Sequence, residues 1–102
     1  MQLVVRPRFY EDIVEESAWL AENAGAEIAH RWHEAVWQTI GELEKFPFLG
    51  RERRDLTPKG TRSWRTNKFA RWLIFYTVRD DTLVILRVRH GTMNLLALEL
   101  DN

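Results

Sequence analysis

Three consecutive runs of β-forming residues between Arg62 and Gly91 constrain the fold of this chain most strongly. Arg62–Thr66 is short, residues 71–78 are almost continuously apolar, and Thr82–His90 follows a tight turn at Asp80-Asp81. A continuously apolar strand is typical of a central position with both sheet faces covered. The sequence therefore predicts a mostly antiparallel sheet with residues 71–78 at its centre.

The first half of the chain has a helical period. Residues 8 to about 23 and about 26 to 45 each carry apolar side chains at three- or four-residue steps. Gly25 ends the first helix, and the short link predicts an antiparallel helix hairpin. The predicted stripe of the second helix is Ile28, Trp32, Ala35, Val36, Thr39, Ile40, Leu43 and Phe46.

Two further segments complete the expected architecture. Residues 3–5 form a short first strand at the edge of the sheet, and residues 48–60 form an irregular connection punctuated by glycine and proline. We predict an α+β fold in the order β-α-α-β-β-β. Its N-terminal strand and helix hairpin pack on a small, twisted, mostly antiparallel sheet, in one domain over residues 1–102.

Composition excludes several classes of protein. The chain has 102 residues and no cysteine, which excludes disulfides and thiolate metal sites and favours a reducing cytoplasm. It has no apolar run of the roughly 20 residues that a membrane span needs. Residues 1–50 carry 4 basic and 9 acidic side chains and residues 51–102 carry 11 and 6, which gives net charges of −5 and +5. A total of zero argues against a general nucleic-acid binder.

The charges of the strand region are nearly all basic, because its only acids are the turn residues Asp80 and Asp81. We expect one sheet face to pack on the helices and the other to be open at its basic end, partly covered by the tail 93–100. With no acid beside them, these cations would hold an anion or be covered by a partner. The predicted core-facing residues are Val84, Leu86 and Val88, and the opposite set is Leu83, Ile85, Arg87 and Arg89.

Three segments resemble motifs of the ParE/RelE toxin superfamily. The segment Glu44-Lys45-Phe46-Pro47-Phe48-Leu49-Gly50-Arg51 resembles its "FPxLGR" segment in the ParE branch. Leu73-Ile74-Phe75-Tyr76-Thr77-Val78 is similar to its "LIFYxV" strand, and Ile85-Leu86-Arg87-Val88-Arg89-His90-Gly91 to its "ILRVxHG" strand. The motifs occur in family order over essentially the whole chain. The resemblance implies the toxin of a type II toxin–antitoxin module, neutralised by a cognate antitoxin whose C-terminal segment wraps over it.

The two branches of the superfamily differ in activity. The RelE branch cleaves mRNA on the ribosome, whereas the ParE branch inhibits DNA gyrase without an identified catalytic residue. This chain has Leu73 where RelE-like toxins place an arginine, and no tyrosine follows Tyr76. The resemblance therefore implies gyrase as the target. The alternatives are a ribosome-dependent mRNA endonuclease and an inactive homologue that only binds its antitoxin.

The residues expected to contact the target or antitoxin are Arg65, Arg71, Arg87, Arg89 and His90. Guanidinium groups there would bind carboxylates or phosphates bidentately. In the endonuclease alternative, His90 would be the acid or base, and Arg65, Arg71 and Arg87 would stabilise the developing phosphorane charge. We expect alanine at both Arg87 and Arg89 to leave the fold intact.

Aromatic residues away from the apolar stripes are candidates for a partner surface. Trp19 and Trp37 either form such a surface or pack against residues 48–60 or the tail. Trp32 and Trp72 are assigned to the core. Trp64 stacks on a base or fills the core, and the core is preferred.

Two polar groups receive a structural interpretation. His30 and His33 are spaced as metal ligands can be, beside Glu34, but no further ligand is evident, and neither a metal nor a cofactor is expected. The run Arg51, Arg53 and Arg54 is expected to be a solvated loop that could add phosphate contacts.

Overall fold

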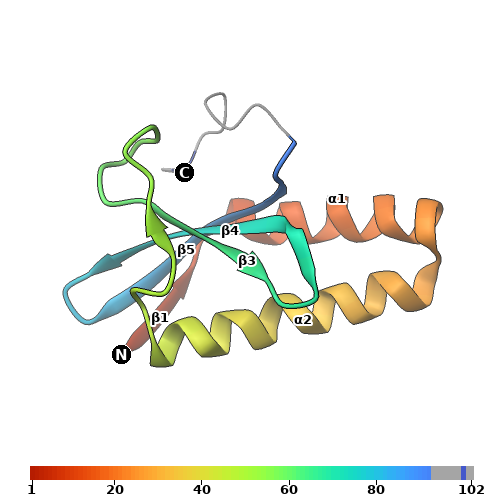
Figure 1. Cartoon of the computed structure of the whole chain (residues 1–102). Coiled ribbons are helices and arrows are strands. Elements are labelled where there is room, and N and C mark those ends of the chain that lie inside the picture. The colour runs from red at the N-terminus through yellow and green to blue at the C-terminus, as the bar shows by residue number, and fades with distance from the viewer. Residues whose placement is uncertain (93–99, 101–102) are drawn as a thin grey trace.

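The computed structural model describes residues 1–92 and Leu100, and it contains two helices and a five-stranded sheet (Figure 1). The sheet order is β1-β5-β4-β3-β2, with β1 parallel to β5 and the other neighbours antiparallel. The predicted α+β fold is confirmed, and β4 is its central strand. The elements are β1 (Gln2–Val5), α1 (Pro7–Ala24), α2 (Ala26–Lys45), β2 (Arg51–Glu52), β3 (Arg62–Thr66), β4 (Phe69–Arg79) and β5 (Thr82–His90).

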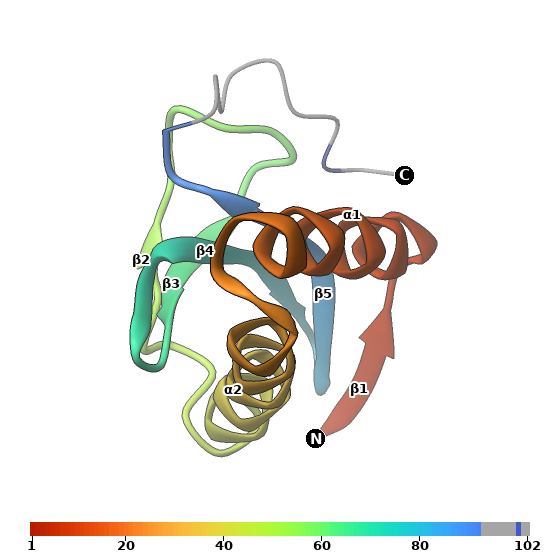
Figure 2. The same ribbon diagram turned by 90° about the vertical axis from the view of Figure 1, so that its right-hand side faces the viewer.

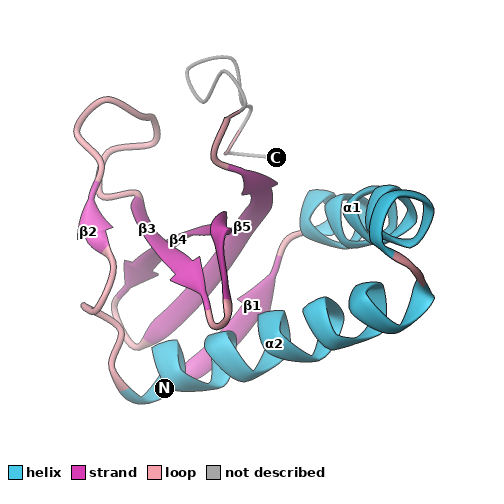
Figure 3. Ribbon diagram, turned by 45° about the vertical axis from the view of Figure 1, so that its right-hand side comes forward, coloured by secondary structure: helices cyan, strands magenta, loops and turns pink. Residues whose placement is uncertain are grey.

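The helix hairpin is defined by residues that suit helix ends. Pro7 begins α1, where its missing N–H has no helical partner to lose. Gly25 has a φ of 101°, and its N–H bonds to the carbonyls of Leu20 and Ala21. This positive φ favours glycine, so α1 ends there and α2 begins at the next residue. Both helices lie on one side of the sheet (Figure 3), which is called the helix face below.

The main core fills the space between the helices and the helix face. Its largest fully buried members include Trp32 of α2, Phe9 of α1 and Tyr76 of β4. Trp32 and Trp72 are in this core as predicted, and Trp64 is partly buried against it. The predicted stripe of α2 is confirmed except at its ends, because Ile28 is only half-buried and Phe46 is 62% exposed. Phe46 differs because α2 ends at Lys45 and the chain turns there.

A smaller cluster covers the opposite side of the sheet, called the second face. It consists of Leu56, Phe75, Val84, Leu86 and Leu100. Leu56 comes from residues 48–60, which were expected to be irregular throughout but contain the two-residue strand β2. The tail was expected to cover this face. Leu100 does so, while residues 93–99, 101 and 102 lie outside the described residues.

A β-bulge in β5 changes which residues share a face. Phe75 pairs with Arg87 while Tyr76 pairs with Ile85, so Leu86 is an extra residue on β5. The predicted division of β5 is therefore wrong in part. Leu83, Ile85 and Val88 belong to the main core, whereas Val84 and Leu86 belong to the second cluster. The sequence pattern assumed unbroken alternation, which the bulge interrupts.

Candidate functional site

The arginines of β5 are bound by the carboxylates of α1. The strand β1 pairs with β5 only from Thr82 to Ile85, and beyond that point α1 lies against β5 (Figure 2). Asp12 Oδ2 accepts hydrogen bonds from Arg87 Nε at 2.6 Å and from the Val88 N–H at 3.2 Å. Asp12 Oδ1 accepts from Arg87 Nη2 at 2.9 Å. Asp12 thus accepts a hydrogen bond from a backbone N–H of β5 that lies beyond the segment paired with β1.

Arg89 shares the same carboxylate. Its Nη1 lies 3.1 Å from Asp12 Oδ1 and 3.0 Å from Glu15 Oε2. Burial alone would lower the pKa of Arg89, but the hydrogen bonds that it donates to Glu15 and Asp12 raise the pKa above the ordinary arginine value. Both arginines and Asp12 are buried, and Arg89 is the most exposed of the three at 9%. The group is a closed ion-pair cluster between α1 and β5.

This cluster corrects two expectations. The arginines of β5 were predicted to have no acid beside them, and that is wrong for Arg87 and Arg89. Their double replacement by alanine was expected to leave the fold intact, but it would leave Asp12 buried without a counter-ion, which is strongly destabilising. The sequence did carry a signal. Asp12 lies three residues after Phe9 and directly before Ile13, at the border of the apolar stripe of α1.

Arg65 and Arg71 have a different environment. Arg65 pairs with Leu73, and Leu73 pairs with Arg89, so these side chains follow one row across the second face. Arg71 lies two residues before Leu73 on the same face. Both Arg65 and Arg71 are exposed, and neither has an acidic partner among residues 1–92 and Leu100. They are the predicted site residues that present accessible charge.

His90 lies on the helix face, away from that row. It pairs with Trp72, and the two rings meet edge to face with centroids 4.8 Å apart. Its Nδ1 accepts a hydrogen bond from the Thr92 N–H at 3.2 Å and lies 2.7 Å from Thr92 Oγ1. The register therefore separates His90 from Arg65 and Arg71, which sequence reasoning had grouped together.

A pocket of about 280 Å³ lies beside His90. It brings together residues of α1 with the ends of β4 and β5, and its lining is Glu16, Trp19, Trp72, Arg89, His90 and Thr92. Trp19 is 52% exposed and faces Trp72 with ring centroids 6.4 Å apart. The tail, one of its predicted neighbours, lies outside the described residues except for Leu100. Trp37 is half-buried against Phe9, with ring centroids 5.5 Å apart.

Two of the segments that resemble family motifs, residues 44–51 and 73–78, contact each other at Tyr76. Its hydroxyl donates to the Pro47 carbonyl at 2.8 Å and accepts from the Gly50 N–H at 2.8 Å. A Cβ at Gly50 would lie 2.6 Å from that hydroxyl oxygen and 2.7 Å from the Ser63 carbonyl, so only glycine fits. Burial raises the pKa of Tyr76, although the hydrogen bond to Gly50 and the nearby Arg62 act in the opposite direction. These contacts join residues 47–50 to β4 and explain the glycine at position 50.

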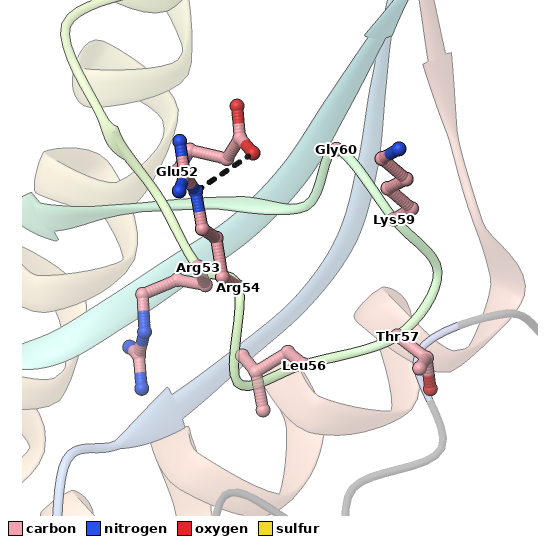
Figure 4. Close-up of a pocket in the computed structure, with 7 residues that line it drawn as sticks. All are labelled: Glu52, Arg53, Arg54, Leu56, Thr57, Lys59 and Gly60. Atoms are coloured by element: carbon pink, nitrogen blue, oxygen red, sulfur yellow. Dashed lines mark ion pairs between the residues drawn. The ribbon is translucent and has the colours of Figure 1, made fainter.

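The run Arg51, Arg53 and Arg54 is only partly the solvated loop that was expected. Arg53 is 7% exposed and binds both carboxylate oxygens of Asp55, at 2.9 and 2.7 Å. This hydrogen-bonded pair lowers the pKa of Asp55. Arg54 lies 3.7 Å from Glu52 and points away from Arg53 (Figure 4). The pocket of about 510 Å³ beside them therefore lacks a converging set of uncompensated cations.

The helix histidines show no metal geometry. His30 Nε2 lies 3.0 Å from Glu34 Oε1, while His33 Nε2 faces Trp37 Nε1 at 3.4 Å. Within the described residues, no three potential ligand side chains are grouped as a metal ion would require. In residues 1–92, no helix has both the length and the apolar character needed to cross a membrane.

Comparison with known proteins agrees with the fold and the motifs. Residues 3–95 match the family model for the ParE toxin of the type II toxin–antitoxin system parDE. The chain is 35% identical to Toxin ParE3 of Caulobacter vibrioides over 78 residues, which are 76% of this chain and 74% of that protein. A solved chain of the chromosomal ParDE TA system from P. aeruginosa has the same fold, with a TM-score of 0.74 and 17% identity over 88% of this chain and 95% of that one. The chain belongs to the ParE toxin family of type II toxin–antitoxin systems.

Proposed function

We propose that this toxin inhibits growth by binding DNA gyrase and that a cognate antitoxin neutralises it. The observation that carries the choice of binding over catalysis is the ion-pair cluster of Asp12, Glu15, Arg87 and Arg89. A ribonuclease needs cations that can turn toward a developing phosphorane charge. Arg87 and Arg89 are instead committed to carboxylates of α1.

The position of His90 supports the same proposal. An acid or base must lie within hydrogen-bond reach of the reacting hydroxyl while the cations contact the phosphate. The strand register puts His90 on the helix face and Arg65 and Arg71 on the second face. A single phosphodiester would have to reach both sides of the sheet. This arrangement favours separate contacts with a macromolecule over one catalytic centre.

Within this proposal, the predicted site residues divide by role. Arg65 and Arg71 contact the target or antitoxin directly, because they are exposed and have no acidic partner among the described residues. Arg89 and His90 contribute from the pocket at the end of β5. Arg87 is a positioning residue that holds α1 against the sheet.

The antitoxin is proposed from the family and from the ParDE system of the solved relative. An anionic or apolar segment of such a partner would suit the exposed cations and the adjoining second face. Because this proposal has the toxin bind gyrase and an antitoxin inside the cell, it implies that the toxin acts in the cytoplasm.

The proposal is tested by expressing the chain under a tight promoter and measuring plasmid supercoiling and mRNA integrity in the same cells. We expect loss of negative supercoiling with intact mRNA, and recovery when the neighbouring antitoxin frame is co-expressed. Cleaved mRNA with normal supercoiling would contradict the proposal and favour the ribosome-dependent endonuclease. Neither effect, together with tight antitoxin binding, would favour an inactive homologue.

A further inference from the structure

The pocket beside His90 combines aromatic walls with a carboxylate. Trp19 of α1 and Trp72 of β4 are tilted by 56° to each other, and His90 closes a third side. Glu16 Oε1 accepts a hydrogen bond from Trp72 Nε1 at 3.0 Å. That bond fixes the carboxylate next to the aromatic rings. Its second oxygen has no hydrogen-bond partner among residues 1–92 and Leu100.

The charge around this pocket is negative on balance. Arg89 lines it, but the cluster that holds Arg89 contains two arginines and two carboxylates, those of Asp12 and Glu15. Glu16 adds a further carboxylate, whose charge acts on Arg89 and whose only hydrogen bond within the described residues comes from Trp72. An anion in the pocket would therefore be repelled by Glu16, because the nearby arginines are already paired with carboxylates. A cation would meet both the carboxylate and the faces of aromatic rings.

We infer that this pocket takes one cationic side chain, an arginine or lysine, from the cognate antitoxin. The inference rests on the proposed function for the identity of the partner. Its volume of about 280 Å³ is below the range of pockets that hold whole small molecules, and it suits one long side chain. The aliphatic stem would lie on Trp19, which is half-exposed without such cover, and the charged head would reach Glu16.

This assignment gives the two surfaces of the toxin opposite preferences. The row of Arg65 and Arg71 favours acidic groups of a partner, whereas the Trp19 pocket favours a basic one. A partner segment with both charges would bind in one direction only, because reversal would place like charges together. The pocket is thus a specificity element for the antitoxin.

The test is an NMR titration of the full chain with N-acetyl-arginine methylamide, with N-acetyl-citrulline methylamide as the uncharged probe of nearly equal shape. We expect the indole N–H signals of Trp19 and Trp72 to shift with the arginine probe while that of Trp37 stays unchanged. The citrulline probe should bind at least about threefold more weakly. Equal binding of the two probes, or no shift at Trp19 and Trp72, would overturn the inference.

Two variants and one matched control sharpen the result. Glu16→Gln keeps an oxygen acceptor for Trp72 and should weaken the arginine probe about threefold to tenfold. Trp19→Ala should weaken it similarly, whereas Glu22→Gln, an exposed carboxylate of α1 outside the pocket, should have no effect. Unchanged affinity in Glu16→Gln would contradict the assigned role of the carboxylate.

The partner assignment is tested with the purified toxin–antitoxin complex. We expect the arginine probe to produce no shift at Trp19 in the complex, because the antitoxin side chain occupies the pocket. Probe binding of equal strength with and without antitoxin would overturn the assignment. Neither measurement depends on gyrase, so a chain that does not inhibit gyrase can still pass or fail this test.

Discussion

Asp12 and Arg87 form a buried ion pair that joins the first helix to the last strand. Arg87 donates from Nε to Asp12 Oδ2 at 2.6 Å and from Nη2 to Oδ1 at 2.9 Å, and the Asp12 side chain is 2% exposed. The same carboxylate accepts the Val88 N–H. One acidic side chain therefore accepts a backbone N–H of β5 beyond the segment paired with β1, binds two arginines and holds α1 against the sheet.

Replacement of Asp12 by alanine should strongly destabilise the fold. It removes the carboxylate that pairs with the buried Arg87, which costs about 3–5 kcal/mol of unfolding free energy. Urea denaturation followed by tryptophan fluorescence measures this loss. Glu15→Ala is the matched control, because the Glu15 side chain is 65% exposed and its pair with Arg89 contributes at most about 1 kcal/mol. A similar loss in the two variants would contradict the central place of Asp12.

Loss of the Tyr76 hydroxyl should weaken the junction between α2 and the sheet. In Tyr76→Phe the Pro47 carbonyl and the buried Gly50 N–H lose their partner, at a cost of about 1–3 kcal/mol at neutral pH. Chemical denaturation measures the change. The control is Tyr10→Phe, because Tyr10 is half-exposed and its hydroxyl makes no hydrogen bond to another of the described residues. Equal stability of wild type and Tyr76→Phe would contradict this account of the motif.

The raised pKa of Tyr76 predicts sensitivity to alkali. A group whose pKa is higher in the folded state stabilises the fold fully below its unfolded value and loses that contribution as pH rises through the folded value. We therefore expect the stability of the wild type to fall above about pH 10 more steeply than that of Tyr76→Phe, which cannot ionise there. Parallel denaturation profiles above pH 10 would contradict the prediction.

Two glycines should respond to alanine in opposite ways. At Gly50 the added Cβ would lie 2.6 Å from the Tyr76 hydroxyl and 2.7 Å from the Ser63 carbonyl, so Gly50→Ala should cost roughly 1–3 kcal/mol or more. Gly41 lies inside α2 with nothing within 4 Å of an added Cβ, so Gly41→Ala should stabilise by up to about 1 kcal/mol. Thermal unfolding of the two variants measures both signs. Stabilisation by Gly50→Ala would show that this contact is not close.

Replacement of Trp32 by alanine should lower stability far more than replacement of Trp19. Trp32 is fully buried in the main core, so Trp32→Ala should cost about 3–5 kcal/mol. Trp19 is half-exposed, so Trp19→Ala should lower the free energy of unfolding much less. Denaturant midpoints of the two variants measure the difference, and a smaller loss at Trp32 than at Trp19 would contradict the placement of the core.

The sequence predicts the elements of this fold because their signals are local. The steps between Phe9, Ile13 and Leu20, the break at Gly25 and the turn at Asp80-Asp81 each depend on a few neighbouring residues. The bulge at Leu86 does not, because it appears only when β5 pairs with β4. Strict alternation therefore assigned Val84 and Leu86 to the wrong side of the sheet.

The candidate site is harder to predict for the same reason. Arg87 and Asp12 are 75 positions apart in the sequence, and nothing local shows that they meet. The last strand is basic in sequence, but in the fold the acids of α1 neutralise its two arginines. Arg65 and Arg71 are exposed, as expected of site residues. His90 pairs with Trp72 and therefore lies on the helix face, apart from them.

Inhibition of purified DNA gyrase is the measurement that bears most directly on the proposed function. Titration with the wild-type chain should abolish supercoiling, and the Arg65→Ala/Arg71→Ala variant should need at least about tenfold more protein for the same inhibition. Arg79→Ala, an exposed arginine at the far end of β4, should act like the wild type. Undiminished supercoiling at saturating concentrations of the wild-type chain would contradict the proposal.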